Sequence, residues 1–291
     1  MLGSNTMWGL MSPVAKMAMA SGLISPLLMT DFRIVGAAIL FWIASLFTPA
    51  ERVPARDLIR LAGAAMLGIL LNQGSFIFGV GLTSPGEASI ITTTMPMWVM
   101  VLAALFLKEP ITIRKTAGIL VGASGAIILV LNSTNTALTG DNPVLGDILV
   151  LTAQLCYALY LTLYKNFIAR YSLVTLMKWM FTFAAIVILP LSIPNIIDTN
   201  WAAITPAGWA GVAYVVIGGT FIAYICVMIG QKNLRPTIVG MYNYVQPIVA
   251  TCIGITLGLD RFTPLKLLAV ALIFSGVFLV TTSRARQTST S

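Results

Sequence analysis

The chain of 291 residues carries a formal net charge of +8, and 58% of its residues are hydrophobic while only 9% are charged. Soluble domains contain about 25% charged residues, so a soluble fold could not cover this apolar content, whereas a lipid bilayer accepts it directly. The basic residues lie in short loops between apolar runs without interleaved aromatic residues, which argues against nucleic acid as a partner.

The apolar runs predict ten membrane-spanning helices, since a spanning helix needs about 20 apolar residues. The loops between the runs are marked by proline, glycine and charged residues. The polar segment 132–147 is the longest of these loops and separates two sets of five helices. In chain order we place the helices at residues 3–21, 27–48, 58–80, 84–107, 112–132, 146–167, 172–194, 206–230, 234–258 and 263–283.

The orientation follows from the positions of lysine and arginine. With the N-terminus in the cytoplasm, twelve of the 17 basic residues fall on the cytoplasmic side. Only Arg261 and Lys266 fall outside, while Lys16, Arg33 and Lys178 lie within predicted helices. Cytoplasmic loops are enriched in these residue types. The sequence therefore predicts a multi-pass protein of the bacterial inner membrane with both termini in the cytoplasm.

The two sets of helices repeat each other at a constant offset of 151 residues. The landmarks that coincide are Gly79 with Gly230, Pro85 with Pro236, Pro96 with Pro247, Glu109 with Asp260, and Gly125 with Gly276. Because each set has an odd number of helices, the second set enters the membrane from the opposite side. The sequence thus predicts inverted repeats, which give many secondary carriers their two alternating states and a substrate site near the midplane.

These landmarks divide the chain into four parts. Residues 1–132 are the first repeat, 133–145 an extracytoplasmic linker, 146–283 the second repeat and 284–291 a cytoplasmic tail. The small residues of the fifth and tenth helices predict close helix packing, either within one chain or in a homodimer. These residues are Gly118, Gly122, Gly125, Ser275 and Gly276.

Several short motifs follow one another along the chain. They are Trp8-Gly9 with Lys16, Pro26 with Phe32-Arg33, Thr83 to Ser89 with Pro96 and Glu109, Gly118 to Gly125, and Gly146-Asp147 with Tyr157 to Tyr160. In this order they resemble the EamA branch of the drug/metabolite transporter superfamily, over nearly the whole chain. The resemblance implies two EamA repeats and export or exchange of a solute across the inner membrane, and some members export amino acids. Arg33 has no basic counterpart in the second repeat, where Met180 stands.

Charged residues inside the helices are the first candidates for the site, because a charge in the membrane costs about 2.5–3.5 kcal/mol on insertion scales and should face a cavity or a partner. Lys16 and Lys178 are candidates for contacting an anionic group of a substrate, although Lys16 could instead reach the outer interface. Asp31 and Glu87 are candidates for proton coupling. Alternatively, Asp31 is an interfacial charge that pairs with Lys16, and Glu87 complements the dipole of its own helix in headgroup water.

Pro96 and Pro247 interrupt the fourth and ninth helices at corresponding positions. A proline frees a backbone carbonyl, and matched broken helices near the midplane are typical of carrier binding sites. The alternative is a structural kink whose carbonyls bond to neighbouring threonines. We therefore predict a substrate site formed by Trp8, Lys16, Asn72, Thr93, Tyr157, Lys178, Trp179, Asn243 and Gln246. Further candidates for the same cavity are Gln73, Gln154, Tyr160 and Tyr224.

The predicted function is a secondary transporter for a small metabolite such as an amino acid, working by alternating access. The alternatives are a channel, or a membrane protein that transports nothing, such as a lipid-acting enzyme or an assembly subunit. The sequence has no histidine, no paired carboxylates within the membrane and no phosphate-binding motif, so we expect no enzyme activity, no metal and no cofactor. The expected partners are a small-molecule substrate and membrane lipid.

Overall fold

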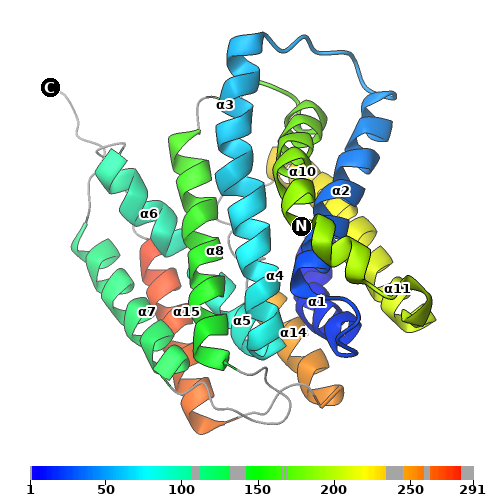
Figure 1. The fold of residues 1–291 in the computed structure, drawn as a ribbon. Helices are drawn as coiled ribbons and strands as arrows, with labels where there is room; N and C mark the ends of the chain where they lie inside the picture. The colour runs from blue at the N-terminus through cyan, green and yellow to red at the C-terminus, as the bar shows by residue number, and fades with distance from the viewer. Residues whose placement is uncertain are drawn as a thin grey trace, which may run out of the picture.

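The computed structural model describes residues 2–106, 112–131, 142–164, 167, 170–233, 245–258 and 263–282, and within these ranges the chain is helical and without strands (Figure 1). The first half contains α1 (Leu2–Met19), α2 (Pro26–Ser45), α3 (Ala55–Ala65), η1 (Met66–Leu71), α4 (Asn72–Leu82), α5 (Pro85–Thr92), α6 (Met95–Phe106) and α7 (Ile113–Leu131). The second half contains α8 (Pro143–Leu163), α10 (Leu173–Asp198), η2 (Trp201–Ala203), α11 (Pro206–Ala213), η3 (Tyr214–Ile222), α12 (Ala223–Asn233), α14 (Val245–Thr256) and α15 (Pro264–Thr282).

A small polar residue followed by proline begins five of the described helices. These pairs are Ser25-Pro26, Ser84-Pro85, Asn142-Pro143, Thr205-Pro206 and Thr263-Pro264. In each, the polar side chain accepts a hydrogen bond from a backbone N–H of the first turn, and proline stands where no N–H is needed. The local sequence therefore determines where these helices start.

Six stretches of the described residues are long and apolar enough to cross a bilayer. They are Pro26–Ser45, Ala55–Leu82, Pro85–Phe106, Pro143–Leu163, Leu173–Asp198 and Pro206–Val227, with shorter apolar helices at Thr116–Gly125, Val245–Thr256 and Pro264–Gly276. The helices also expose large apolar side chains such as Leu120 and Ile186, which suits contact with lipid. The beginning of the predicted ninth helix, residues 234–244, lies outside the described residues.

The local geometry of the two halves matches at the offset seen in the sequence. Both third helices of the predicted repeats contain a π-helical segment, η1 in the first half and η3 in the second. The fourth helix is interrupted at Thr93 and Thr94, between α5 and α6, two residues before Pro96. The counterpart α14 begins at Val245, two residues before Pro247. The break in the first half thus lies just N-terminal to Pro96, while the residues that precede α14 lie outside the described part of the chain.

Equivalent helices of the two halves make equivalent packing contacts. Helix α2 packs on α10, and α7 packs on α15, so each of these pairs joins equivalent helices. Helix α1 packs on α14 and on α11–η3–α12, while its counterpart α8 packs on α5–α6 and on η1–α4. The contact between α7 and α15 is close, because a Cβ atom on Gly276 would lie 2.5 Å from the backbone O of Gly118 and the backbone N of Gly122. The small residues of these two helices therefore pack within the chain.

Candidate functional site

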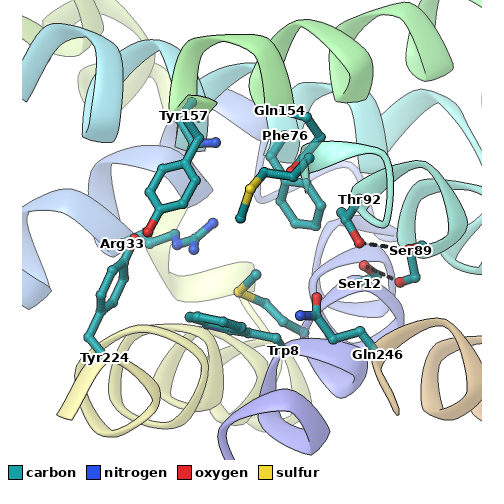
Figure 2. A pocket seen from close by; sticks show the side chains of 13 residues that line it. Trp8, Ser12, Arg33, Phe76, Ser89, Thr92, Gln154, Tyr157, Tyr224 and Gln246 are labelled. Carbon is teal, nitrogen blue, oxygen red and sulfur yellow. Dashed lines mark hydrogen bonds between the residues drawn. The ribbon is translucent and has the colours of Figure 1, made fainter. Parts of the chain in front are cut away.

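A cavity of about 110 Å³ lies where helices of the two halves meet, and we call it the central cavity (Figure 2). The side chains around it come from α1, α2, α4, α5, α6, α8, α12 and α14. They are Trp8, Met11, Ser12, Arg33, Asn72, Phe76, Ser89, Thr92, Met95, Gln154, Tyr157, Tyr224 and Gln246. The wall thus combines one cation with amides, hydroxyls, aromatic rings and thioethers, and it contains no carboxylate among the described residues.

Arg33 is the cation of this wall, and only 4% of its surface is exposed. Its Nε donates a hydrogen bond of 3.0 Å to Oγ1 of Thr220 in η3. Thr220 in turn donates to the carbonyl of Val215, at 2.9 Å, so the π-helical segment holds the acceptor in place. Figure 2 shows the guanidinium beside the hydroxyl ends of Tyr157 and Tyr224.

The indole and the amides of the wall are held by backbone and side-chain bonds. Trp8 Nε1 donates to the carbonyl of Gly219 at 3.1 Å, and its ring meets the edge of Tyr224 with centroids 6.0 Å apart. Asn72 Nδ2 donates to the carbonyl of Ala153 at 2.8 Å. Gln246 Nε2 donates to Oδ1 of Asn5 at 2.7 Å. These bonds join α1 to α14 and α4 to α8, so the wall is ordered before any ligand enters.

The break between α5 and α6 is satisfied by its own threonines. The hydroxyls of Thr92, Thr93 and Thr94 donate to the carbonyls of Ser89, Ile90 and Ile91 at 2.6, 2.6 and 2.7 Å. Thr92 still borders the central cavity, whereas Thr93 is buried away from it. All three threonine hydroxyls are therefore bound to backbone carbonyls of α5, as the alternative of a structural kink at Pro96 predicts.

At one end of the bundle, the predicted outer end, a largely buried group of charged and polar side chains joins the two halves, and we call it the closure cluster: Lys16, Thr83, Glu87, Asp147 and Lys266. Lys266 Nζ lies 3.3 Å from Glu87 Oε1, and these side chains are only 7% and 10% exposed. Thr83 Oγ1 lies 2.6 Å from Asp147 Oδ1 and 3.0 Å from Glu87 Oε2. Lys16 donates to the carbonyls of residues 81 and 83 at 2.6 and 3.0 Å. The cluster holds two cations and two carboxylates, and it joins α5 to α15 and the end of α4 to α8.

The profile of the EamA-like transporter family matches residues 1–131 and again residues 144–282. The chain belongs to the EamA-like transporter family. The EamA domain is thus present twice, and the chain is a membrane transporter by family.

Similar EamA relatives include an uncharacterized inner membrane transporter, YedA, of Escherichia coli, which is 29% identical over 88% of this chain and 81% of that protein. An uncharacterized transporter of Archaeoglobus fulgidus is 23% identical over 96% of both chains. The protein PecM of Dickeya dadantii is 23% identical over 82% of this chain and 86% of its own length. A crystal structure shares the fold with a TM-score of 0.61, at 19% identity and 96% coverage of both chains.

Four of the residues predicted for the substrate site line the central cavity of this EamA protein, namely Trp8, Asn72, Tyr157 and Gln246. Of the further candidates, Gln154 and Tyr224 line it as well, while Gln73 and Tyr160 do not. Asn243 lies outside the described residues. Pro96 and Pro247 lie in the first turns of α6 and α14, next to the cavity-lining residues Met95 and Gln246.

The predicted cations Lys16 and Lys178 and the neighbouring Trp179 lie elsewhere. Lys16 is engaged by the carbonyls at the end of α4, in the closure cluster. Lys178 Nζ lies 4.8 Å from the ring centroid of Trp42, and Trp179 meets the same ring edge-on at 5.4 Å. Lys178 and Trp179 therefore belong to the interface of α2 with α10, because both contact Trp42 across this helix pair and neither lines the central cavity.

Neither candidate for proton coupling borders the central cavity. Asp31 accepts a hydrogen bond of 2.9 Å from Ser192 and borders an apolar groove of about 430 Å³ between α2, α10, α11 and η3. Its expected partner Lys16 is bound elsewhere. Glu87 lies in the first turn of α5, as the alternative reading has it, but it is buried and paired with Lys266 across the halves rather than placed in headgroup water.

Two important residues were missed by sequence reasoning. Arg33 was placed within a predicted helix and Lys266 at the outer start of another, and neither was a candidate for the site, yet both are buried, at 4% and 6% exposure. The signal for Arg33 was present, because an ionisable residue inside a predicted span is a candidate for a functional site by default. Lys266 lay only one turn inside the tenth helix, where sequence cannot separate a loop from a buried helix start.

Proposed function

We propose that the protein is a secondary transporter that exports or exchanges a small metabolite by alternating access through the central cavity. In this proposal ten helices form two inverted five-helix repeats, and both termini lie in the cytoplasm. One observation carries the proposal: polar side chains from both halves converge on one cavity inside an apolar bundle. Polar groups in lipid are costly, so their convergence supports a path for a polar solute.

The size of the central cavity suits a small metabolite. A buried water needs roughly 10–15 Å³ of such space, so 110 Å³ holds about seven to eleven waters, or a solute with a comparable number of non-hydrogen atoms. An amino acid or a small organic acid falls within that range. The protein carries out no chemical conversion in this proposal.

The closure cluster supplies the second element of alternating access, a contact between the halves that can break and re-form. Glu87 and Asp147 stand on opposite halves, as do Lys16 and Lys266. In this proposal, the cluster separates the central cavity from the outer side. Opening to that side requires these bonds to separate while an equivalent closure forms at the other end.

Counterflow in liposomes tests this function. Vesicles containing the purified protein are preloaded with unlabelled amino acids, nucleosides or organic acids, and uptake of the labelled solute is followed. A carrier accelerates uptake only into preloaded vesicles, a channel gives equal uptake into empty ones, and a non-transporting protein gives neither. Ser89→Leu, which fills the central cavity, should abolish counterflow, whereas Ser124→Leu on the exposed face of α7 should not.

A further inference from the structure

Arg33 differs from the other cations buried in the bundle, because its charge faces the central cavity. Lys16 is bound by two carbonyls, Lys266 pairs with Glu87, and Lys178 lies over the ring of Trp42. Arg33 makes a single hydrogen bond, through Nε to a neutral hydroxyl, and forms no ion pair among the described residues. A guanidinium cannot deprotonate to avoid burial. An anion bound beside the guanidinium would therefore compensate the buried charge of Arg33.

The buried carboxylates of the described chain are already engaged away from Arg33. Asp31 accepts from Ser192 and faces the groove on the other side of α2. Glu87 pairs with Lys266, and Asp147 accepts from Thr83, both in the closure cluster. Among the described residues, the Arg33 guanidinium thus has no carboxylate partner.

The guanidinium has five N–H donors in a planar fork, and only the Nε donor is bound to Thr220. Its two terminal nitrogens remain for a ligand, and this fork matches the two oxygens of a carboxylate. In Figure 2 the guanidinium lies at the cavity wall beside the hydroxyl ends of Tyr157 and Tyr224. The cavity is also lined by apolar side chains, namely those of Trp8, Phe76, Met11 and Met95.

We propose that Arg33 is the substrate anchor, binding a carboxylate of a small solute whose apolar part contacts the apolar lining of the cavity, Trp8 and Phe76 included. This inference rests on the proposed carrier function and adds the substrate class. The cavity wall carries one cation and no described carboxylate, so the site matches a small organic acid. An amino group on the same solute would meet only hydroxyls, amides and aromatic rings.

Binding measurements on the purified protein in nanodiscs test the assignment. The probes are matched pairs of an acid and its uncharged amide, 3-phenylpropionate with 3-phenylpropionamide and lactate with lactamide, together with phenylalanine and phenylalaninamide. Hydrogen bonds to a charged group contribute enough to binding that the best carboxylate should bind about ten- to a hundredfold more tightly than its amide. The expected Arg33→Gln phenotype is loss of this preference.

Arg33→Lys should retain a reduced preference for the acid, because lysine keeps the charge but lacks the planar fork. Arg60→Gln is the matched control, since Arg60 is a half-exposed arginine whose partner Asp57 lies one turn away on α3. It should bind every probe as the wild type does. The acid-to-amide ratio of the wild type needs no variant and remains decisive if Arg33→Gln does not fold.

Equal binding of acids and amides, an unchanged acid preference in Arg33→Gln, or no binding of any carboxylate would each overturn the assignment of Arg33. None of these results bears on counterflow, which is measured separately with uncharged solutes in the panel. Absence of counterflow for every solute, with intact acid-selective binding, would instead refute the carrier function and leave Arg33 as an anion-binding residue.

Discussion

The ion pair between Glu87 and Lys266 offers the sharpest test of how the two halves hold together. Its atoms are 3.3 Å apart, and both side chains are almost fully buried. Removing one partner of a buried pair typically destabilises a protein by about 3–5 kcal/mol, because the other charge stays buried without compensation. Glu87→Gln preserves shape and leaves the cluster with one excess positive charge. Lys266→Met leaves one excess negative charge.

We expect each single variant to lose about 3 kcal/mol of folding free energy, which corresponds to a fall in melting temperature of roughly 6–12 °C. The double variant Glu87→Gln/Lys266→Met restores the charge balance of the cluster, since Lys16 and Asp147 remain. It should therefore be more stable than the sum of the single effects predicts. Melting of the purified protein, followed by the loss of monodisperse protein on heating, measures all three.

The pair Arg60–Asp57 is the control, because its atoms are 3.7 Å apart and the Arg60 side chain is 44% exposed. Arg60→Gln should change stability by no more than about 0.5 kcal/mol, as exposed pairs do. Additive effects of the two closure-cluster substitutions would show that Glu87 and Lys266 do not stabilise each other. A second readout bears on transport: Ser89→Cys in the cavity should react faster with an impermeant thiol reagent when Glu87 is replaced, and unchanged reactivity would refute the cluster as a closure.

Three further predictions concern orientation, packing and acid stability. In a cysteine-free background, Ser133→Cys should react with an impermeant reagent in intact cells and Ser289→Cys should not, and the reverse pattern would invert the predicted topology. Gly276→Ala places a Cβ 2.5 Å from backbone atoms of α7 and should destabilise the protein by about 1–3 kcal/mol. Gly3→Ala, whose Cβ meets nothing within 4 Å, should be neutral. Equal melting temperatures of the two variants would contradict the close packing of α7 on α15. Burial raises the pKa of Glu51, but hydrogen bonds from the start of α10 outweigh it and hold this pKa below the usual 4.5. The stabilising contribution of Glu51 is therefore complete above pH 4.5 and is lost as the pH falls through the lower folded-state pKa. Glu51→Gln should accordingly flatten the acid side of the profile of stability against pH. An unchanged profile would contradict this.

Much of this architecture was readable from the sequence because the bilayer imposes local rules. A spanning helix must be a run of about 20 apolar residues, and a small polar residue before proline starts a helix wherever it occurs. The offset between the halves also predicted matching features, which appear as the π-helical segments η1 and η3. Of the polar residues predicted to share one cavity because lipid penalises isolated polar groups, Trp8 and Gln246 line the central cavity.

The partner of each buried charge was decided only by the tertiary structure. Lys16 and Arg33 are equally plausible cavity residues by sequence, yet Lys16 meets carbonyls of the α4 end and Arg33 faces the cavity. Lys266 bonds to a carboxylate nearly 180 residues earlier in the chain. Which side of a helix faces a neighbour depends on how helices rotate and cross when their surfaces pack, and that choice involves residues far apart in the sequence. Sequence alone therefore determined that charges lie within the membrane, while packing between the halves determined which of them close the bundle and which one is left to meet a solute.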